Sequence, residues 1–253
     1  MGNGKIETNW DDFLRSVSSW RQFSSRSAEI FLNDDYVFKI FNSSTPINRR
    51  KENYIDFLAS LDPNLLTIPD RKVYINGEYY GYRMENGGSP LLDYIIDNNV
   101  NFDEKVKIVY VIKKIIKYLD AQGIIHGDFR LANLLYKEGI IRLTDLNSIL
   151  FPGDKPYDMP TLHLWWYNSI DSSILIDNLA FNLLTYILLN YENTVIKWAM
   201  ERGINAFNVS SVFDNDKNLF DHEVMDVVKN AILNKCGAMR QLKPDTYLID
   251  YLK

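Results

Sequence analysis

Two polar residues, Asp128 and Asn133, stand five positions apart in a short gap between apolar runs, IIHGDFRLANLL at 124–135. A carboxylate in such a loop can accept the proton of a hydroxyl group. Carboxylate and amide oxygens can also serve as ligands for a hard divalent cation. An ordinary turn is the simpler interpretation, because Gly, Asp and Asn are common turn residues. Other polar residues in the chain have to decide between the two.

Three further polar residues lie close to apolar segments that would hold them in place. Lys39 interrupts the apolar run YVFKIF, Glu52 lies in the segment that follows, and Asp145 ends the β-rich run IIRLTD. Each one alone is weak evidence, because a strand lysine is usually a solvated edge residue and a helix glutamate usually lies on the surface. Their joint order along the chain carries the argument.

The elements that must position these residues begin with strands. Residues 28–41 and 72–85 each have the pattern of a β-hairpin, and Asn76-Gly77 is a strong two-residue turn signal. Between them, residues 47–61 place apolar side chains at helical spacing, which predicts a helix. The N-terminal part is therefore expected to be a small antiparallel sheet with one helix.

After the linker candidate NGGSP (86–90) the pattern becomes helical. Residues 101–123 predict a long amphipathic helix, with Asn101 as its N-cap and Gly123 at its end. A short hairpin around Lys137-Glu138-Gly139 follows, and residues 177–190 predict a buried helix. The sequence thus indicates an α+β fold with a strand-rich first part and a larger, mainly helical second part.

The composition excludes several classes of protein. With 28 basic and 33 acidic residues among 253, the net charge of −5 argues against nucleic acid and anionic membranes as partners. One cysteine excludes an intrachain disulfide and a cysteine-based zinc site. We expect a cytoplasmic protein, because the N-terminus lacks an apolar signal segment and the longest apolar run (179–189) is too short to span a bilayer.

In order and spacing, these residues resemble the eukaryotic-like protein kinase family over about residues 20–190. Val37-Phe38-Lys39-Ile40 matches the strand motif Val-Ala-Ile-Lys, and residues 126–133 match the catalytic loop His-Arg-Asp-x-x-x-x-Asn. Asp145-Leu146-Asn147 stands where Asp-Phe-Gly is expected, and residues 84–88 stand at the hinge. The resemblance implies one kinase-like domain over 1–253, with lobes at 10–85 and 91–253 around the hinge 86–90.

The resemblance also implies a role for each site residue, with ATP and Mg²⁺ as cofactors. Phosphoryl transfer depends on positioning and charge neutralisation. Lys39 would hold the α- and β-phosphates and Glu52 would hold Lys39, while Asp145 and Asn133 would bind the metal. Asp128 would take the proton of the acceptor hydroxyl, and Arg130 would offset charge on the transferring phosphate. The remaining nucleotide contacts implied are Ile30, Val37, Glu85 and Asn86.

The same resemblance implies structural roles for His126, the first residue of the loop, and for Asp177. His126 is expected to pack and hydrogen-bond locally. Asp177, at the start of the predicted buried helix, is expected to accept hydrogen bonds from the loop's backbone N–H groups.

The chain departs from the family pattern at four places. Phe23, Ser25 and Ala28 stand where the glycine-rich loop has its three glycines, and Gly127 replaces the arginine of His-Arg-Asp. Asn147 replaces the glycine of Asp-Phe-Gly, and no Ala-Pro-Glu is visible near 161–168. The His-Gly-Asp form is also found in aminoglycoside and choline phosphotransferases and in lipopolysaccharide kinases.

These observations predict a Mg-ATP-dependent phosphotransferase acting on a hydroxyl group, with protein Ser/Thr as its substrate. Two alternatives stay open: a small-molecule kinase for a sugar, lipopolysaccharide or aminoglycoside, and a pseudokinase that only binds nucleotide. Residues 148–176 should discriminate between substrates, because an open groove there would suit a peptide and a deep acidic pocket a cationic small molecule. An unrelated α+β domain with coincidental motifs is the remaining alternative.

Overall fold

A computed structural model describes residues 4–25, 28–42, 52–146, 149–150, 175–202, 213, 219–233, 243 and 245–253. The chain divides into two compact units, Met1–Gly88 with Arg142–Asn147, and Ser89–Ile141 with Ser148–Lys253. The boundary after Gly88 lies within the predicted linker 86–90. The sequence had assigned Arg142–Asn147 to the helical part, which is a point of difference.

The reason for that difference is a short backbone pairing within the first unit. Leu143 N donates to Leu65 O, and Thr67 N donates to Leu143 O, both at 2.9 Å. The Thr67 hydroxyl also donates to the Thr144 hydroxyl at 2.9 Å. These hydrogen bonds tie the segment that carries Asp145 to the strand-rich unit, although it follows the loop and hairpin of the second unit in sequence.

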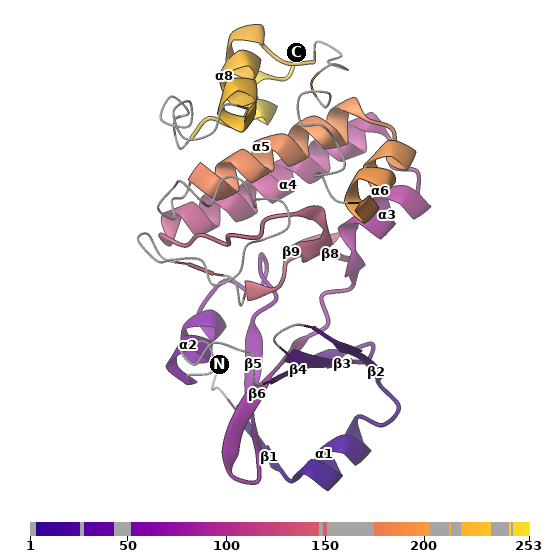
Figure 1. Cartoon of the computed structure of the whole chain (residues 1–253), viewed down its shortest axis with the longest axis vertical. Helices are drawn as coiled ribbons and strands as arrows, with labels where there is room; N and C mark the ends of the chain where they lie inside the picture. The colour runs from indigo at the N-terminus through magenta and orange to yellow at the C-terminus, as the bar shows by residue number, and fades with distance from the viewer. Residues whose placement is uncertain are drawn as a thin grey trace. The chain divides into compact units, whose positions relative to one another are not determined.

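The first unit contains a six-stranded sheet in the order β1-β5-β6-β4-β3-β2 (Figure 1). Its strands are β1 (Gly4–Thr8), β2 (Arg21–Ser24), β3 (Ala28–Leu32), β4 (Tyr36–Phe41), β5 (Pro69–Ile75) and β6 (Glu78–Glu85). The two predicted hairpins are confirmed as β3–β4 and β5–β6. Asn76 and Gly77 both have positive φ, +53° and +81°, as a two-residue turn of the mirror-image type requires.

The N-terminal strand β1 and helix α1 (Trp10–Ser16) were not predicted. Strand β1 pairs in parallel with β5, and the Asn9 side chain caps α1 by accepting from Asp12 N. Phe13 of α1 is 2% exposed and packs with Phe31 and Phe38 of the sheet. Through these contacts α1 covers one face of the sheet. Burial of a phenylalanine contributes about 2 to 3 kcal/mol, which helps to hold the helix there.

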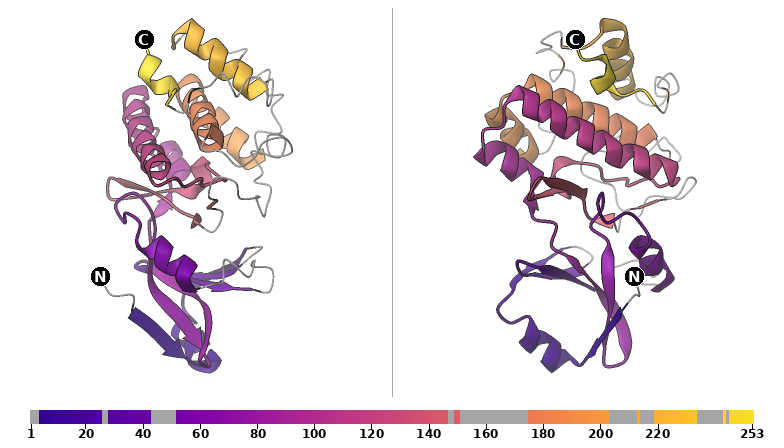
Figure 2. Two further views of the ribbon diagram at one scale, coloured as in Figure 1. Left: turned by 90° about the vertical axis from the view of Figure 1, so that its left-hand side faces the viewer. Right: turned by 180° about the vertical axis from the view of Figure 1, so that it is seen from behind.

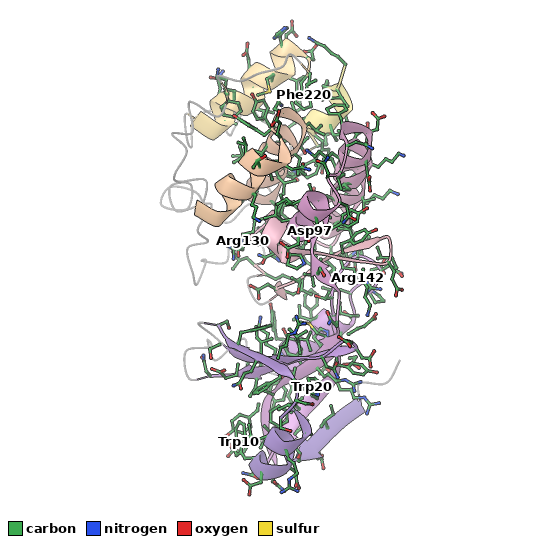
Figure 3. All side chains as sticks on the ribbon, turned by 90° about the vertical axis from the view of Figure 1, so that its right-hand side faces the viewer. Trp10, Trp20, Asp97, Arg130, Arg142 and Phe220 are labelled. Atoms are coloured by element: carbon green, nitrogen blue, oxygen red, sulfur yellow. The ribbon has the colours of Figure 1, made fainter. Side chains whose placement is uncertain are left out.

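Two tryptophans extend this covered face. Trp10 stacks edge-on against Phe13 and Tyr80, and Trp20 lies 5.2 Å from Phe38 between ring centroids. Both are labelled beside α1 and the sheet in Figure 3. Because one face of β3 and β4 is filled in this way, the alternate residues of these strands, including Lys39, point to the opposite face.

On that opposite face the expected helix between the hairpins is α2 (Glu52–Ala59). The prediction of a helix is confirmed, and residues 47–51 of its predicted range lie outside the described residues. Ile55 and Leu58 are 1% and 0% exposed, so they form the buried side of the helix.

The second unit is mainly helical. Its elements are α3 (Leu91–Asp97), α4 (Phe102–Ala121), a 3-10 turn η2 (Leu131–Asn133), α5 (Leu175–Asn190), α6 (Asn193–Arg202), α8 (His222–Leu233) and η7 (Leu248–Tyr251). A three-stranded sheet in the order β7-β8-β9 is made of β7 (Ser89–Pro90), β8 (Leu134–Lys137) and β9 (Ile140–Leu143). The division between the two units falls within β9.

The long helix α4 confirms its sequence signals. Asn101 accepts a hydrogen bond from Glu104 N at 3.0 Å, and Gly123 ends the turn after the helix with φ +65°. The reciprocal bond of a capping box is replaced, because the Glu104 carboxylate accepts instead from the Tyr94 hydroxyl at 2.6 Å.

Helices α4 and α5 lie side by side in every view (Figures 1 and 2). Every residue from Ile176 to Asn190 is buried, so α5 is the central helix of this unit, as its apolar sequence predicted. In the described part of the chain no helix combines the length and the apolar character needed to cross a membrane.

Candidate active site

Lys39 is held in the interior of the first unit. Its side chain extends from β4, the residue is 6% exposed, and its Nζ lies 2.7 Å from Asp145 Oδ1. Burial opposes the charged form, but the charge of Asp145 and its hydrogen bond outweigh burial, so the pKa of Lys39 is raised from its ordinary value. Lys39 is therefore an ammonium ion paired with a carboxylate.

Asp145 is held in an unusual backbone conformation. Its φ is +58°, in the left-handed region that costs a residue with a β-carbon about 1 kcal/mol or more. The hydroxyl of Tyr54 donates to the carbonyl oxygen of the next residue, Leu146, at 2.8 Å, which helps to fix the segment. The Asp145 side chain is 42% exposed, so this carboxylate is both paired with Lys39 and accessible to solvent.

The expected pair between Glu52 and Lys39 is wrong in this structure. Glu52 instead accepts hydrogen bonds from Lys72 Nζ at 3.2 Å and from the hydroxyl of Tyr74. The Tyr74 hydrogen bond is the main reason that the pKa of Glu52 is lowered. Lys72 and Tyr74 belong to β5, the strand that α2 contacts, so they lie within reach of the Glu52 carboxylate.

Lys72 explains why Glu52 stays there. This lysine is 8% exposed, and its Nζ lies 2.8 Å from Asp56, one helical turn after Glu52. Residues four apart on a helix share a face, so one buried ammonium contacts both carboxylates. Burial opposes the charged form, but the hydrogen bonds that Lys72 donates to Asp56 and Glu52 outweigh it, and the pKa of Lys72 is raised.

Sequence reasoning missed Gly81 as a residue that positions Lys39. A β-carbon added at Gly81 would lie 2.0 Å from the carbonyl oxygen of Lys39 and 3.0 Å from its carbonyl carbon. Real side chains do not approach a backbone this closely, so only glycine lets β6 pair with β4 here. A lone glycine inside a predicted strand is the signal that could have found it.

The four residues expected to contact the nucleotide all belong to the first unit. Ile30 and Val37 are half-buried and share the Lys39 face of the sheet, because Ile30 pairs directly with Lys39 and Val37 lies two residues before it. Glu85 Oε1 lies 3.5 Å from Arg142 Nη1. Asn86 Nδ2 donates to Asn33 O at 2.7 Å, so this side chain shapes the turn. Their contact with a nucleotide stays a prediction.

In the second unit the Asp177 side chain holds the backbone of the predicted catalytic loop. The Asp177 carboxylate accepts hydrogen bonds from the backbone N–H groups of His126, at 2.5 Å, and Gly127, at 3.0 Å. This confirms the structural role expected for Asp177, and burial raises the pKa of this carboxyl group. Gly127 has φ +77°, a conformation that glycine adopts without strain.

The same loop places two other predicted site residues, Arg130 and Asn133, beside Asp128. Asn133 Nδ2 donates to Asp128 O at 2.8 Å and to Asp128 Oδ2 at 3.0 Å. Arg130 Nη2, on the residue labelled in Figure 3, lies 3.1 Å from Asp128 Oδ2. His126 Nδ1 accepts from Asp128 N at 3.3 Å, in agreement with its expected local role. The contacts of Asn133 and Arg130 with Oδ2 orient the Asp128 carboxylate.

The predicted metal ligands have suitable donor atoms. Asp145 presents a partly exposed carboxylate, and Asn133 uses its amide nitrogen for both hydrogen bonds, so Oδ1 is the atom chemically able to bind a cation. No cluster of three or more His, Cys, Asp or Glu residues occurs in the described segments. Asn147 and residues 151–174, where the substrate features were expected, lie outside the described residues.

Comparisons of the sequence with known proteins give partial matches to kinases. No protein-family model matches the chain. It is 31% identical over 108 residues to ribosomal protein S6 kinase alpha-2 of Mus musculus. It is 34% identical over 108 residues to ribosomal protein S6 kinase alpha-3 of Homo sapiens, and 35% identical over 110 residues to the alpha-6 protein of Homo sapiens. These alignments cover 41–42% of this chain and only 14% of the length of each relative.

A solved structure shows the same architecture. The kinase domain of M. tuberculosis PknI aligns with 67% of this chain and 70% of its own, with a TM-score of 0.51 and 16% sequence identity. At this level of sequence identity the similarity concerns the fold alone. The chain therefore has a protein kinase-like fold.

Proposed function

We propose that this chain is a phosphotransferase that moves the γ-phosphate of ATP to a hydroxyl group, with protein serine or threonine as the acceptor. The observation that carries the proposal is the pairing of buried Lys39 with Asp145, whose backbone is strained and whose carboxylate is accessible. Strain that the surrounding structure maintains is a common property of functional sites.

The ion pair between Lys39 and Asp145 can separate when a nucleotide binds, so that each residue takes a new partner. A phosphate oxygen can replace the Asp145 carboxylate as the partner of the Lys39 ammonium, because both are anionic acceptors. The released Asp145 carboxylate is then a hard oxygen ligand, with Asn133 as the second protein ligand proposed. Bound Mg²⁺ would supply neutralisation of the phosphate charge, the main requirement of phosphoryl transfer.

Asp128 is the residue proposed to accept the proton of the acceptor hydroxyl. It is held by two donors, Asn133 Nδ2 and Arg130 Nη2, which orient its carboxylate. A positioned carboxylate within hydrogen-bond reach of a hydroxyl can act as a general base. Arg130 is the proposed source of positive charge for the transferring phosphate.

The protein acceptor is supported by the similar sequences, which are ribosomal protein S6 kinases. A small-molecule acceptor is the second candidate, and Gly127 is the observation that favours it. Gly127 has φ +77°. Because this residue is a glycine, no arginine side chain is present here to pair with a phosphorylated segment. The His-Gly-Asp form is shared with kinases of small molecules.

The test is transfer of labelled phosphate from ATP with Mg²⁺, measured as autophosphorylation and on a generic protein substrate. We expect transfer by the unmodified chain and a loss of at least about 100-fold in Asp128→Asn and Asp145→Ala. Transfer that is unchanged in Asp128→Asn would contradict the proposal. ATP-dependent thermal stabilisation without any transfer would instead identify a nucleotide-binding pseudokinase.

A further inference from the structure

The edge strand β2 places an aromatic side chain on the same sheet face as Lys39. Phe23 pairs directly with Ile30, and Ile30 pairs directly with Lys39, so the three share one face across neighbouring strands. The alternate position confirms this assignment, because Gln22 pairs with Phe31, which belongs to the cluster that α1 covers on the other face. Phe23 is 47% exposed.

Phe23 continues an apolar surface that leads to the Lys39–Asp145 pair. Ile30, Leu32, Val37 and Met84 are half-buried, and the pairing of Leu32 with Val37 and of Val37 with Met84 sets them beside the first row. Neighbouring strands lie about 4.8 Å apart, so the backbone of Phe23 lies two strands, or about 10 Å, from that of Lys39. This span is about that of a nucleoside attached to a phosphate group held by Lys39.

The two described residues that flank the turn after Phe23, Ser25 and Ala28, use their backbone N–H groups in hydrogen bonds to each other. Ser25 N donates to Ala28 O at 2.8 Å, and Ala28 N donates to Ser25 Oγ at 3.0 Å. Ser25 Oγ also donates to Ala28 O at 2.9 Å. A glycine-rich loop binds phosphates through free backbone N–H groups, whereas the N–H groups of both of these residues are already engaged.

We propose that Phe23 contacts the base and ribose of the bound nucleotide, so that an aromatic side chain on β2 supplies affinity that the engaged backbone N–H groups of Ser25 and Ala28 do not. The inference rests on the proposed function, because it assigns a further residue to the same nucleotide site. Stacking of a base or sugar on an aromatic ring is tolerant of the base identity. Phe23 therefore favours nucleosides over bare phosphates.

The test measures binding of two probes, MgATP and magnesium tripolyphosphate, by calorimetry. We expect Phe23→Ala to weaken MgATP binding about tenfold, because one stacking contact contributes a factor of this size. Tripolyphosphate has no base or ribose, so its binding should be unchanged. Phe23→Trp should retain the affinity for MgATP.

Leu14→Ala is the matched control, because Leu14 is 49% exposed on α1 and lies on the helix that covers the other face of the same sheet. It should bind both probes as the unmodified chain does. MgATP affinity in Phe23→Ala or Phe23→Gly that equals or exceeds that of the unmodified chain would overturn the inference while leaving the proposed function intact. No binding of MgATP by the unmodified chain, or binding unaffected by Lys39→Met, would overturn the proposed function itself.

Discussion

Two buried lysines of the first unit share one sheet face and differ in the partners that hold them. Lys39 and Lys72 are 6% and 8% exposed, and each pairs across the sheet with Tyr82, which lies between them. Among the described residues Lys39 pairs with one carboxylate, that of Asp145. Lys72 pairs with two carboxylates of the same helix, Glu52 and Asp56.

The two sets of partners indicate which lysine can bind a ligand. Lys72 has its charge balanced by carboxylates spaced one turn apart on α2, and Tyr74 gives Glu52 an additional donor. Lys39 relies on a carboxylate from a strained, half-exposed segment that a ligand can reach. We interpret Lys72 as the anchor of α2 and Lys39 as the residue that exchanges its partner for phosphate.

The largest effect is expected from removing the charge of Lys39. Lys39→Met should reduce phosphate transfer at least about 100-fold, because an electrostatic contact to the transferring group typically contributes about 3 kcal/mol. The measurement is the rate of labelled phosphate transfer at saturating MgATP, together with a thermal melt to show that the variant folds. A transfer rate in Lys39→Met above about a tenth of the original would show that Lys39 is not a residue of the active site.

Gly81→Ala should be the most damaging change to stability around Lys39. The added β-carbon would meet the Lys39 carbonyl oxygen at 2.0 Å, and separation of two central strands should cost about 3 kcal/mol. Urea unfolding measures the loss. Gly77→Ala is the matched control, because Gly77 has φ +81° but open space around it, and should cost only about 1 kcal/mol. Equal losses in the two variants would contradict the close-approach argument.

Local chemistry explains which of these features could be predicted. The Asn76-Gly77 turn and the Asn101 cap depend on residues whose backbone preferences are visible in the sequence. The Asp177 contacts to the loop span 50 positions and were expected only from the resemblance to a family. The parallel pairing of β1 with β5 brings together residues more than 60 positions apart. The sequence of β1, which is five residues long, does not indicate which strand it pairs with.

The pairing of Glu52 could not be predicted for a related reason. Helical spacing indicates which side of α2 is buried, but not which lysine of the sheet its acidic side meets. Lys39 and Lys72 lie on different strands of the same face, and Tyr74 adds a hydrogen bond that favours the Lys72 side. Tertiary contacts, rather than the sequence motif, therefore determine that Glu52 pairs with Lys72 and not with Lys39.

Lys72→Met should lower stability more than activity. Its two carboxylate partners are 46% and 47% exposed, so water can solvate them once the ammonium is lost. The cost is therefore expected to be about 1 to 2 kcal/mol, below that of a fully buried pair. Urea unfolding and phosphate transfer should be measured on the same preparation. A loss of transfer as large as that of Lys39→Met would show that Lys72 acts in the reaction.

The contacts of Glu52 should also give a dependence of stability on pH. Its pKa is lowered in the folded chain, so the stabilisation is present above its ordinary value of 4.5 and is lost as the pH falls through the folded value. Unfolding free energy should therefore decrease in this acidic range. Glu52→Gln should flatten that part of the curve, and an unaltered slope would show that Glu52 makes no net contribution.

The most direct test of the distinction between the two lysines is phosphate transfer by Glu52→Gln, measured beside Lys39→Met. Because Glu52 is paired with Lys72 and Tyr74, and Lys39 is held by Asp145, we predict that Glu52→Gln keeps transfer within about threefold of the original chain, a change of less than about 1 kcal/mol. A loss in Glu52→Gln that matches the loss in Lys39→Met would contradict the account, because it would show that the reaction requires Glu52 beside Lys39.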